Sequence, residues 1–224
     1  MKKEIFDQRE WKSSKTNRRM QYLFYSPSQN EPVPLILYLH GAGSRGNTLS
    51  SIAHVGPLLE VDNGRSIPAA IAAPLCEKDN WFEIFETLLD FVDTMAGEPN
   101  IDRSRIYLTG VSMGGYAAWQ LAMSRPEVFA ALIPICGGGM EWNAARLRNI
   151  PIWAFHGALD TTVSPQESLK MVAAVNKNGG SAKITLFEKT AHNAWDYVFS
   201  REEVWNWLFS NRKIKGVASV GSEN

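Results

Sequence analysis

The stretch RIYLTGVSMGGYAAWQLAM, residues 105–123, decides the fold of this chain. Its first five residues are typical of a buried strand, and the run from Gly115 onward is typical of a helix. Between them stands the pattern G-x-S-x-G, with Ser112 at its centre. A turn this tight strains the backbone of the serine, and the flanking glycines prevent collisions between strand and helix. Strand, sharp turn and helix together predict a nucleophile elbow, in which the serine hydroxyl projects from the sheet above a helix N-terminus.

Apolar runs of strand length alternate with helix-period segments along the rest of the chain. This alternation predicts a mostly parallel central sheet with helices on both faces, which is the α/β class. Ligands of such sheets bind beyond the carboxyl ends of the strands. We expect one α/β domain over residues 1–212 and a disordered tail over 213–224, which is small, polar and contains glycine. The predicted strands are 21–25, 34–39, 69–73, 106–108, 131–135, 151–155 and 183–187, and the predicted helices are 82–95, 115–124, 168–175 and 202–209.

The bulk composition limits the possible functions. The 224 residues include 23 basic and 23 acidic side chains, so the chain lacks the basic surface that a nucleic-acid partner requires. No apolar run approaches the length of a membrane span. The polar N-terminal residues lack the apolar core of a secretory signal, so we predict a cytoplasmic protein. Cys76 and Cys136 each end an apolar run, which favours two buried free thiols over a disulfide or a nucleophile.

A serine hydroxyl is a poor nucleophile unless a base takes its proton, and the chain offers four histidines. His192 follows the last predicted strand, at the same sheet edge as the elbow, and is our candidate for the base. His156 is its main rival. His40 and His156 each precede a glycine directly after a strand, where a role in shaping the backbone is the simpler interpretation. His54 lies in a helix-like stretch, where a place in the core or a pocket wall is expected.

The base in turn needs a carboxylate that holds its tautomer and stabilises the imidazolium. Asp160 lies just past a predicted strand end and is our candidate. The chain order Ser112, Asp160, His192 is then that of the triad in the α/β-hydrolase fold. Glu188 and Asp196 are nearer to the histidine in sequence. However, Glu188 would have to reach around from its own strand, and Asp196 lies beyond the histidine on a predicted helix.

An ester carbonyl becomes an oxyanion in the transition state, and backbone N–H groups must already point at it. The amide of Met113, directly after the serine, is one expected donor. The other is expected from the loop after the first central strand, LHGAGSRG at residues 39–46, where Ala42 is our best candidate. This loop alone could be a plain glycine-rich connector. Its occurrence in register with the elbow and with the acid and base loops favours the oxyanion hole.

Three tryptophans are candidates for the walls of a substrate pocket. Trp81 follows a strand end, Trp195 comes three residues after His192, and Trp142 follows three consecutive glycines. Aromatic walls suit an acyl or aryl group. Ordinary packing explains each of these residues equally well.

Five motifs, in this order, resemble the α/β-hydrolases of the phospholipase/carboxylesterase and dienelactone-hydrolase-like group, which includes predicted bacterial esterases often labelled peptidases. The resemblance covers about residues 20–212. It implies Ser112 as nucleophile, His192 as base and Asp160 as orienting acid, with no metal or other cofactor. Members of the group act on carboxylic esters, and some act on thioesters or on feruloylated and acetylated sugars. The motifs are HGAG at 40–43, the stretch 105–115, PICGGG at 134–139, HGALD at 156–160 and HNAW at 192–195.

The segment 137–148 is too short for a folded cap, so we expect an open, shallow site for small or protruding esters. The leading hypothesis is therefore a metal-independent serine carboxylesterase whose partner is a small-molecule ester. A serine peptidase or amidase using the same triad is the first alternative, although the chain shows no N-terminal propeller of the prolyl-oligopeptidase type. An acyltransferase and a non-catalytic binding protein that retains the fold are the others.

Overall fold

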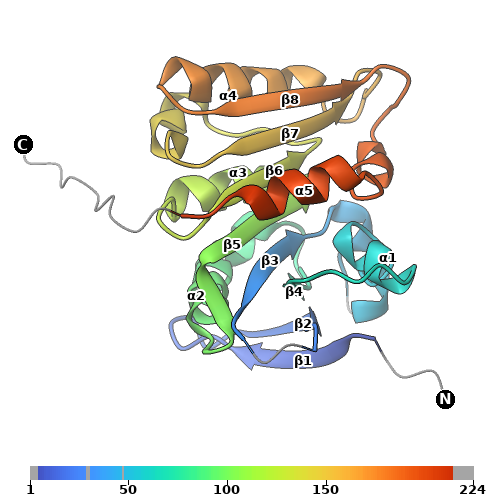
Figure 1. The fold of residues 1–224 in the computed structure, drawn as a ribbon, viewed down its shortest axis with the longest axis vertical. Coiled ribbons are helices and arrows are strands. Elements are labelled where there is room, and N and C mark those ends of the chain that lie inside the picture. Colours follow the sequence, from blue (N-terminus) through green and yellow to red (C-terminus); the bar gives the residue numbers. More distant parts are fainter. Residues whose placement is uncertain (1–4, 29–30, 47, 214–224) are drawn as a thin grey trace, which may run out of the picture.

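The computed structural model describes residues 5–28, 31–46 and 48–213. One eight-stranded sheet forms its centre, in the order β1-β2-β4-β3-β5-β6-β7-β8 (Figure 1). The pairs from β4 to β8 are parallel, and only β1 and β2 run antiparallel to their neighbours. This architecture confirms the predicted fold class. The strands are β1 (Asp7–Lys12), β2 (Arg19–Tyr25), β3 (Val33–Leu39), β4 (Ala70–Pro74), β5 (Ile101–Val111), β6 (Ala131–Ile135), β7 (Ile152–Gly157) and β8 (Ala182–Phe187).

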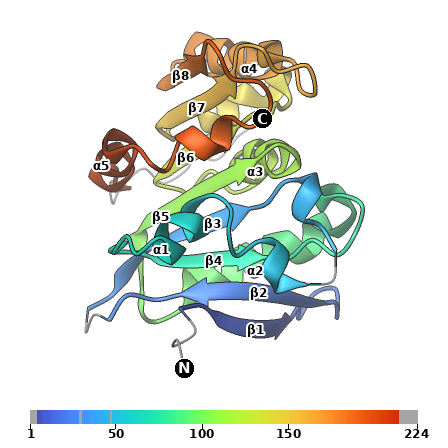
Figure 2. The same ribbon diagram turned by 90° about the vertical axis from the view of Figure 1, so that its right-hand side faces the viewer.

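Helices cover both faces of the sheet, and in Figure 2 α5 lies on one side of it and α3 and α4 lie on the other. Successive residues of β3 point into two separate apolar clusters: Leu35 and Leu37 into one, Ile36 and Tyr38 into the other. Burial on both faces explains why the central strands read as continuous apolar runs. The helices are α1 (Pro57–Asp62), α2 (Phe85–Gly97), α3 (Met113–Ser124), α4 (Pro165–Lys177) and α5 (Glu202–Ser210), with short 3₁₀ turns η1 (Ala42–Ser44), η2 (Leu49–Ser51), η3 (Trp81–Ile84), η4 (Glu141–Leu147) and η5 (Ala194–Tyr197).

Each predicted strand and helix overlaps an element of the structure. The sequence did not predict β1, because most of its residues are exposed and carry no apolar alternation. The short helix α1 was also missed. Between β6 and β7 the described chain holds only η4, so no cap domain is inserted between these two strands. None of the described helices has the length and hydrophobicity needed to cross a membrane. Apart from Lys213, the tail predicted at 213–224 lies outside the described residues.

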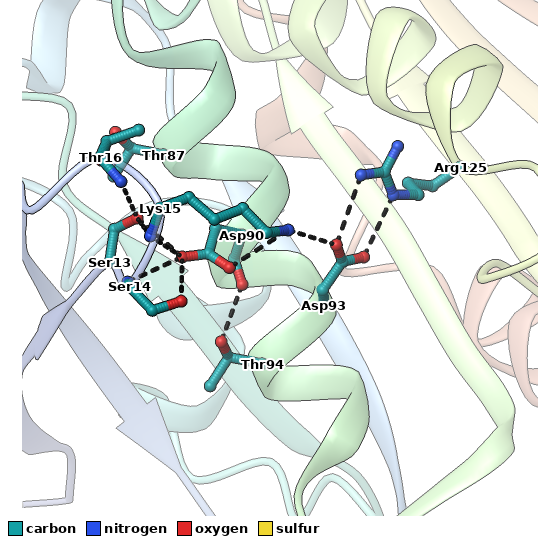
Figure 3. Close-up of polar contacts among 9 residues, drawn as sticks. All are labelled: Ser13, Ser14, Lys15, Thr16, Thr87, Asp90, Asp93, Thr94 and Arg125. Atoms are coloured by element: carbon teal, nitrogen blue, oxygen red, sulfur yellow. Dashed lines mark hydrogen bonds and ion pairs between the residues drawn. The ribbon is translucent and has the colours of Figure 1, made fainter.

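The turn between β1 and β2 is fastened to α2 through the carboxylate of Asp90, whose side chain is only 7% exposed (Figure 3). Asp90 Oδ2 accepts hydrogen bonds from Ser13 Oγ at 2.7 Å and from Ser14 N at 3.0 Å. The Lys15 ammonium lies 3.4 Å from Oδ1. The hydrogen bond from Ser13 is the main cause that holds the pKa of Asp90 below its usual range. This carboxylate therefore stabilises the fold as an anion.

We expect Asp90→Ala to lower the free energy of unfolding by about 2–4 kcal/mol, because a buried hydroxyl and an amide lose their acceptor. Urea denaturation at pH 7 measures this loss. Since the pKa of Asp90 is lower in the folded state than in the unfolded state, its stabilisation is present at neutral pH. It disappears as the pH falls through the folded-state pKa, so the wild-type and variant stabilities should converge in acid.

Asp93 provides the matched control, because it lies on the same helix but its side chain is 36% exposed. It pairs with Lys15 at 3.3 Å and with Arg125 at 3.2 Å. Such solvent-exposed pairs contribute less than about 1 kcal/mol. If Asp93→Ala destabilised the chain as much as Asp90→Ala, the buried carboxylate would not be the anchor of this turn.

Candidate active site

Ser112 stands at the bend between β5 and α3, with φ of +53° and ψ of −117°. A positive φ is strained for a residue other than glycine. The amide of Ser112 donates to Ile135 O at 2.9 Å, which fixes the bend to the end of β6. A side chain on Gly110 would overlap the Gly114 carbonyl, and one on Gly114 would overlap the carbonyl of Leu39. The structure thus has the tight elbow that the sequence predicts, and both glycines are required for it.

The structure brings Ser112, His192 and Asp160 together from three different loops. His192 Nε2 lies 2.8 Å from Ser112 Oγ, and His192 Nδ1 lies 2.7 Å from Asp160 Oδ2. The Asp160 side chain is fully buried, and that of His192 is 23% exposed. An ionised carboxylate only accepts hydrogen bonds, so the proton of a neutral His192 sits on Nδ1. The lone pair of Nε2 then faces the serine hydroxyl and accepts its hydrogen bond.

Local hydrogen bonds keep Asp160 in its charged form. Its Oδ1 accepts from Thr162 N and from Val163 N, both at 2.9 Å. Burial raises the pKa of Asp160, but the hydrogen bonds from His192 and from these two amides outweigh burial, and the pKa lies below its usual value. The carboxylate is therefore an anion at neutral pH and can stabilise a positive charge on His192.

The rival histidine lies on the far side of the acid. His156 is fully buried, and its Nε2 lies 3.0 Å from Val163 O and 3.2 Å from Asp160 Oδ2. Its Nδ1 lies 2.8 Å from Ser168 Oγ. Burial is the main cause that lowers the pKa of His156. Because the oxygens of Val163 and Asp160 both face Nε2, this nitrogen carries the proton and donates. His156 therefore contacts the acid and not the serine.

The other two histidines also lie away from the serine hydroxyl. His40 Nε2 accepts from Cys76 N at 2.9 Å, which ties the ends of β3 and β4 together. The expectation for His54 is wrong. Its side chain is 65% exposed, and its Nδ1 lies 2.9 Å from Asp62 Oδ2. The sequence around His54 has helix-like composition, but it forms turns at the surface.

The two candidate oxyanion donors both begin a helical turn. Met113 is the first residue of α3, and Ala42 is the first residue of η1. Amides at these positions have no acceptor within their own helix and remain available to a ligand. The loop of Ala42 abuts the elbow, because a Cβ built on Gly41 would lie 3.4 Å from Ser112 Cβ. Both amides thus belong to segments that flank the serine.

The three candidate tryptophans lie in very different surroundings. Trp195 is half-buried, and its ring stands edge-on to His192 with 5.1 Å between the ring centroids. Trp81 is fully buried, and its indole N–H donates to His40 O at 3.0 Å, so it supports the end of β3 and does not line the cavity described below. Trp142 is 81% exposed on η4. Trp195 is thus the candidate whose ring stands against a residue of the Ser112–His192–Asp160 series.

A cavity of about 470 Å³ lies over α3. None of its lining residues is among the site residues that the sequence predicts. The one available signal was the spacing of Tyr116 and Gln120, which follow Ser112 by four and eight residues and therefore share its face of the helix. The lining residues are Phe82, Phe85, Tyr116, Gln120, Gly138, Gly139 and Met140.

Among the described residues, one cluster combines side chains that could ligate a metal: Cys136, Asp160 and His192, whose ligand atoms lie within 4.8 Å of one another. Burial raises the pKa of the Cys136 thiol to about 12, and metals bind the thiolate. The carboxylate and the imidazole are already bonded to each other. The arrangement therefore fits proton transfer better than metal binding. Cys136 and Cys76 are both buried free thiols, as predicted.

Comparison with known proteins finds relatives among hydrolases and esterases. The sequence profile of the dienelactone hydrolase family matches residues 61–196. The crystal structure of a thermostable esterase aligns with a TM-score of 0.82 and 30% identity, over 93% of this chain and 64% of that one. A bifunctional acetylxylan esterase/xylanase of Neocallimastix patriciarum is 28% identical over 145 residues, which are 64% of this chain and 22% of the relative. A poly(3-hydroxyalkanoate) depolymerase C of Paucimonas lemoignei is 28% identical over 53% of this chain and 29% of its own length. The chain thus spans less than a third of these two curated relatives.

Proposed function

The chain belongs to the dienelactone hydrolase family, and we propose that it is a serine esterase that hydrolyses carboxylic esters through an acyl-enzyme on Ser112. The observation that carries this proposal is the continuous series of contacts from acid to nucleophile. Asp160 Oδ2 and His192 Nδ1 are 2.7 Å apart, and His192 Nε2 and Ser112 Oγ are 2.8 Å apart. This geometry is what a base needs to take the proton of a serine hydroxyl. Relatives named as an esterase and a depolymerase support the same chemistry.

In the proposed reaction Ser112 Oγ attacks the ester carbonyl carbon while His192 Nε2 takes the hydroxyl proton. The amides of Met113 and Ala42 donate to the oxyanion of the tetrahedral intermediate. His192 then gives its proton to the departing alcohol. The acyl group remains bonded to Ser112 Oγ. Water, deprotonated by the same nitrogen, attacks the carbonyl carbon of this acyl-enzyme. The bond from that carbon to Ser112 Oγ then breaks, the serine takes the proton back from His192, and the carboxylic acid leaves. Asp160 holds the imidazole and stabilises its positive charge in both steps.

Two features of the elbow support Ser112 as the nucleophile. Its hydroxyl stands at the N-terminus of α3, where the helix dipole favours developing negative charge. Its backbone is held at a positive φ, a conformation that persists only where the surroundings impose it and that is concentrated at functional sites. The side chain of His192 is 23% exposed, which gives water a route to the acyl-enzyme.

Matched substrates separate esterase from peptidase. We expect kcat/KM for p-nitrophenyl butyrate to exceed that for the butyryl p-nitroanilide by at least about 100-fold, because an amine leaves only when it is well protonated in the transition state. Initial-rate assays on the two substrates measure the ratio. Comparable values on the anilide would favour the serine peptidase or amidase.

Two further measurements address the remaining alternatives. A fluorophosphonate probe labels an activated serine, so failure to label the wild-type chain at Ser112 would favour the non-catalytic binding protein. Product analysis in the presence of added alcohols detects acyl transfer. For the esterase we expect the free acid to be the main product, whereas a predominance of the new ester would assign the chain as an acyltransferase.

A further inference from the structure

The cavity over α3 begins about one helical turn from the nucleophile. Ser112 caps α3, and the amide of Tyr116 donates to Ser112 O at 3.1 Å. Tyr116 and Gln120 follow at intervals of four residues, so they continue the same helix face. At 1.5 Å per residue they lie about 6 Å and about 12 Å along the helix axis from the serine. The cavity thus extends from the neighbourhood of Ser112 along α3.

The cavity and Trp195, the ring that stands against the base, pack against different faces of the sheet. Phe85 and Met140, which line the cavity, pack against the apolar cluster that α2, α3 and α4 cover. Trp195, which stands against His192, packs against the cluster on the face of α1 and α5. The base must face the departing alcohol, because it gives that alcohol its proton. The cavity, on the opposite face from Trp195, then remains for the other substituent of the carbonyl carbon, the acyl group.

The lining of the cavity is apolar and aromatic. The rings of Phe82 and Phe85 are stacked, with their centroids 6.1 Å apart. Phe82 is 51% exposed, so its ring is accessible to a ligand. The described lining residues carry no charge, and Gln120 supplies an amide at the end remote from Ser112. Such walls stack on aryl groups and remove alkyl chains from water.

We propose that this cavity, the acyl cavity, binds the acyl group of the ester and makes the enzyme selective for aryl-alkyl and medium-length alkyl acyl groups over acetyl. The inference rests on the proposed esterase function, because the role of His192 sets the direction of the acyl group. It adds a cavity for the acyl group to the open, shallow site that the sequence predicts. Its volume of about 470 Å³ lies within the range of small-ligand pockets.

The substitution Gln120→Trp tests this assignment. Side chains of a helix tilt towards its N-terminus, so the indole would fill the cavity in the direction of Tyr116. Gln120 is half-buried and its side chain bonds only to Ser124 Oγ at 3.3 Å, so we expect the fold to tolerate the change. We expect kcat/KM for p-nitrophenyl octanoate to fall at least about tenfold, and that for p-nitrophenyl acetate to change less than about twofold.

Lys177→Trp is the control, because it adds the same indole at an exposed position of α4 outside the lining of the cavity. It should keep the wild-type preference for octanoate over acetate. The proposal is wrong if Gln120→Trp leaves the preference for octanoate over acetate unchanged. It is also wrong if the variant lowers kcat/KM equally for both substrates while thermal melting shows a folded protein, because the acyl group then lies elsewhere.

Binding without turnover separates this inference from the esterase assignment. Isothermal titration of octanoate into Ser112→Ala should show binding, and Ser112→Ala/Gln120→Trp should bind at least about tenfold more weakly. Suppose that octanoate binds, that Gln120→Trp weakens this binding, and that the wild-type chain hydrolyses no ester. The cavity would then stand as an acyl-binding site, and the esterase assignment would be wrong. If the wild-type chain hydrolyses esters but shows neither acyl selectivity nor octanoate binding, the assignment of the acyl cavity is wrong and the esterase assignment is unaffected.

Discussion

Ser112→Ala is expected to lower kcat for p-nitrophenyl butyrate by a factor of about 10⁴–10⁶. Alanine removes the oxygen that attacks the carbonyl, and His192 then has no hydroxyl to deprotonate. The proposed oxyanion donors and substrate contacts remain, so we expect a small rate above that of water alone to persist. The substitution removes one oxygen from a half-buried position and leaves the backbone bonds of the elbow in place, so a folded protein is expected.

Initial rates at saturating substrate, together with a thermal melt, measure this loss and verify the fold. Fluorophosphonate labelling gives an independent readout: the wild-type chain should take up one label, and the variant none. Ser210→Ala is a suitable control, because that hydroxyl is exposed at the C-terminal end of α5 and donates to Trp207 O at 2.7 Å. If Ser112→Ala kept most of the wild-type activity, another group would be the nucleophile and the assignment would fall.

The residues of the proposed triad were predictable because topology places them. Parallel strands end at one edge of the sheet, so loops after β5, β7 and β8 meet there whatever their length. Asp160 and His192 are candidates because each follows a strand end, and in the structure Asp160 Oδ2 lies 2.7 Å from His192 Nδ1. The elbow was predictable for a different reason. Gly110 and Gly114 are sterically required at a tight turn, and that requirement is visible in the sequence.

The direction of side chains within these loops was not predictable. Trp81 follows a strand end, as expected, but its indole turns inward and donates to a backbone carbonyl. Its neighbour Phe82 points outward and lines the cavity. The two residues are adjacent in the 3₁₀ turn η3, and no periodic pattern distinguishes a buried position from an exposed one in so short an element. The cavity also combines segments distant in sequence, because Met140 and Phe85 meet only in the folded chain.

Asp160→Asn is expected to lower kcat by a factor of about 10⁴ at neutral pH, with little change in KM. Oδ1 of Asp160 accepts from the amides of Thr162 and Val163, so the amide oxygen of asparagine has to take that place. Its NH₂ group then stands where Oδ2 stood, 2.7 Å from His192 Nδ1. Because this group can only donate, Nδ1 must accept and the imidazole proton moves to Nε2. A protonated Nε2 faces Ser112 Oγ and cannot take its proton.

The same substitution also brings two donors together on the other side of the carboxylate. His156 Nε2 lies 3.2 Å from Asp160 Oδ2 and bonds to Val163 O, so the new NH₂ group meets a second N–H. We therefore expect a lower melting temperature as well as lower activity, whereas Asp196→Asn should change neither strongly, because Asp196 is exposed and accepts from Asn193. A proton resonance of His192 Nδ1–H far downfield in the wild type and absent from Asp160→Asn would show the tautomer directly. Activity of Asp160→Asn within about tenfold of wild type would contradict the tautomer argument, since loss of the orienting acid in a serine triad costs far more.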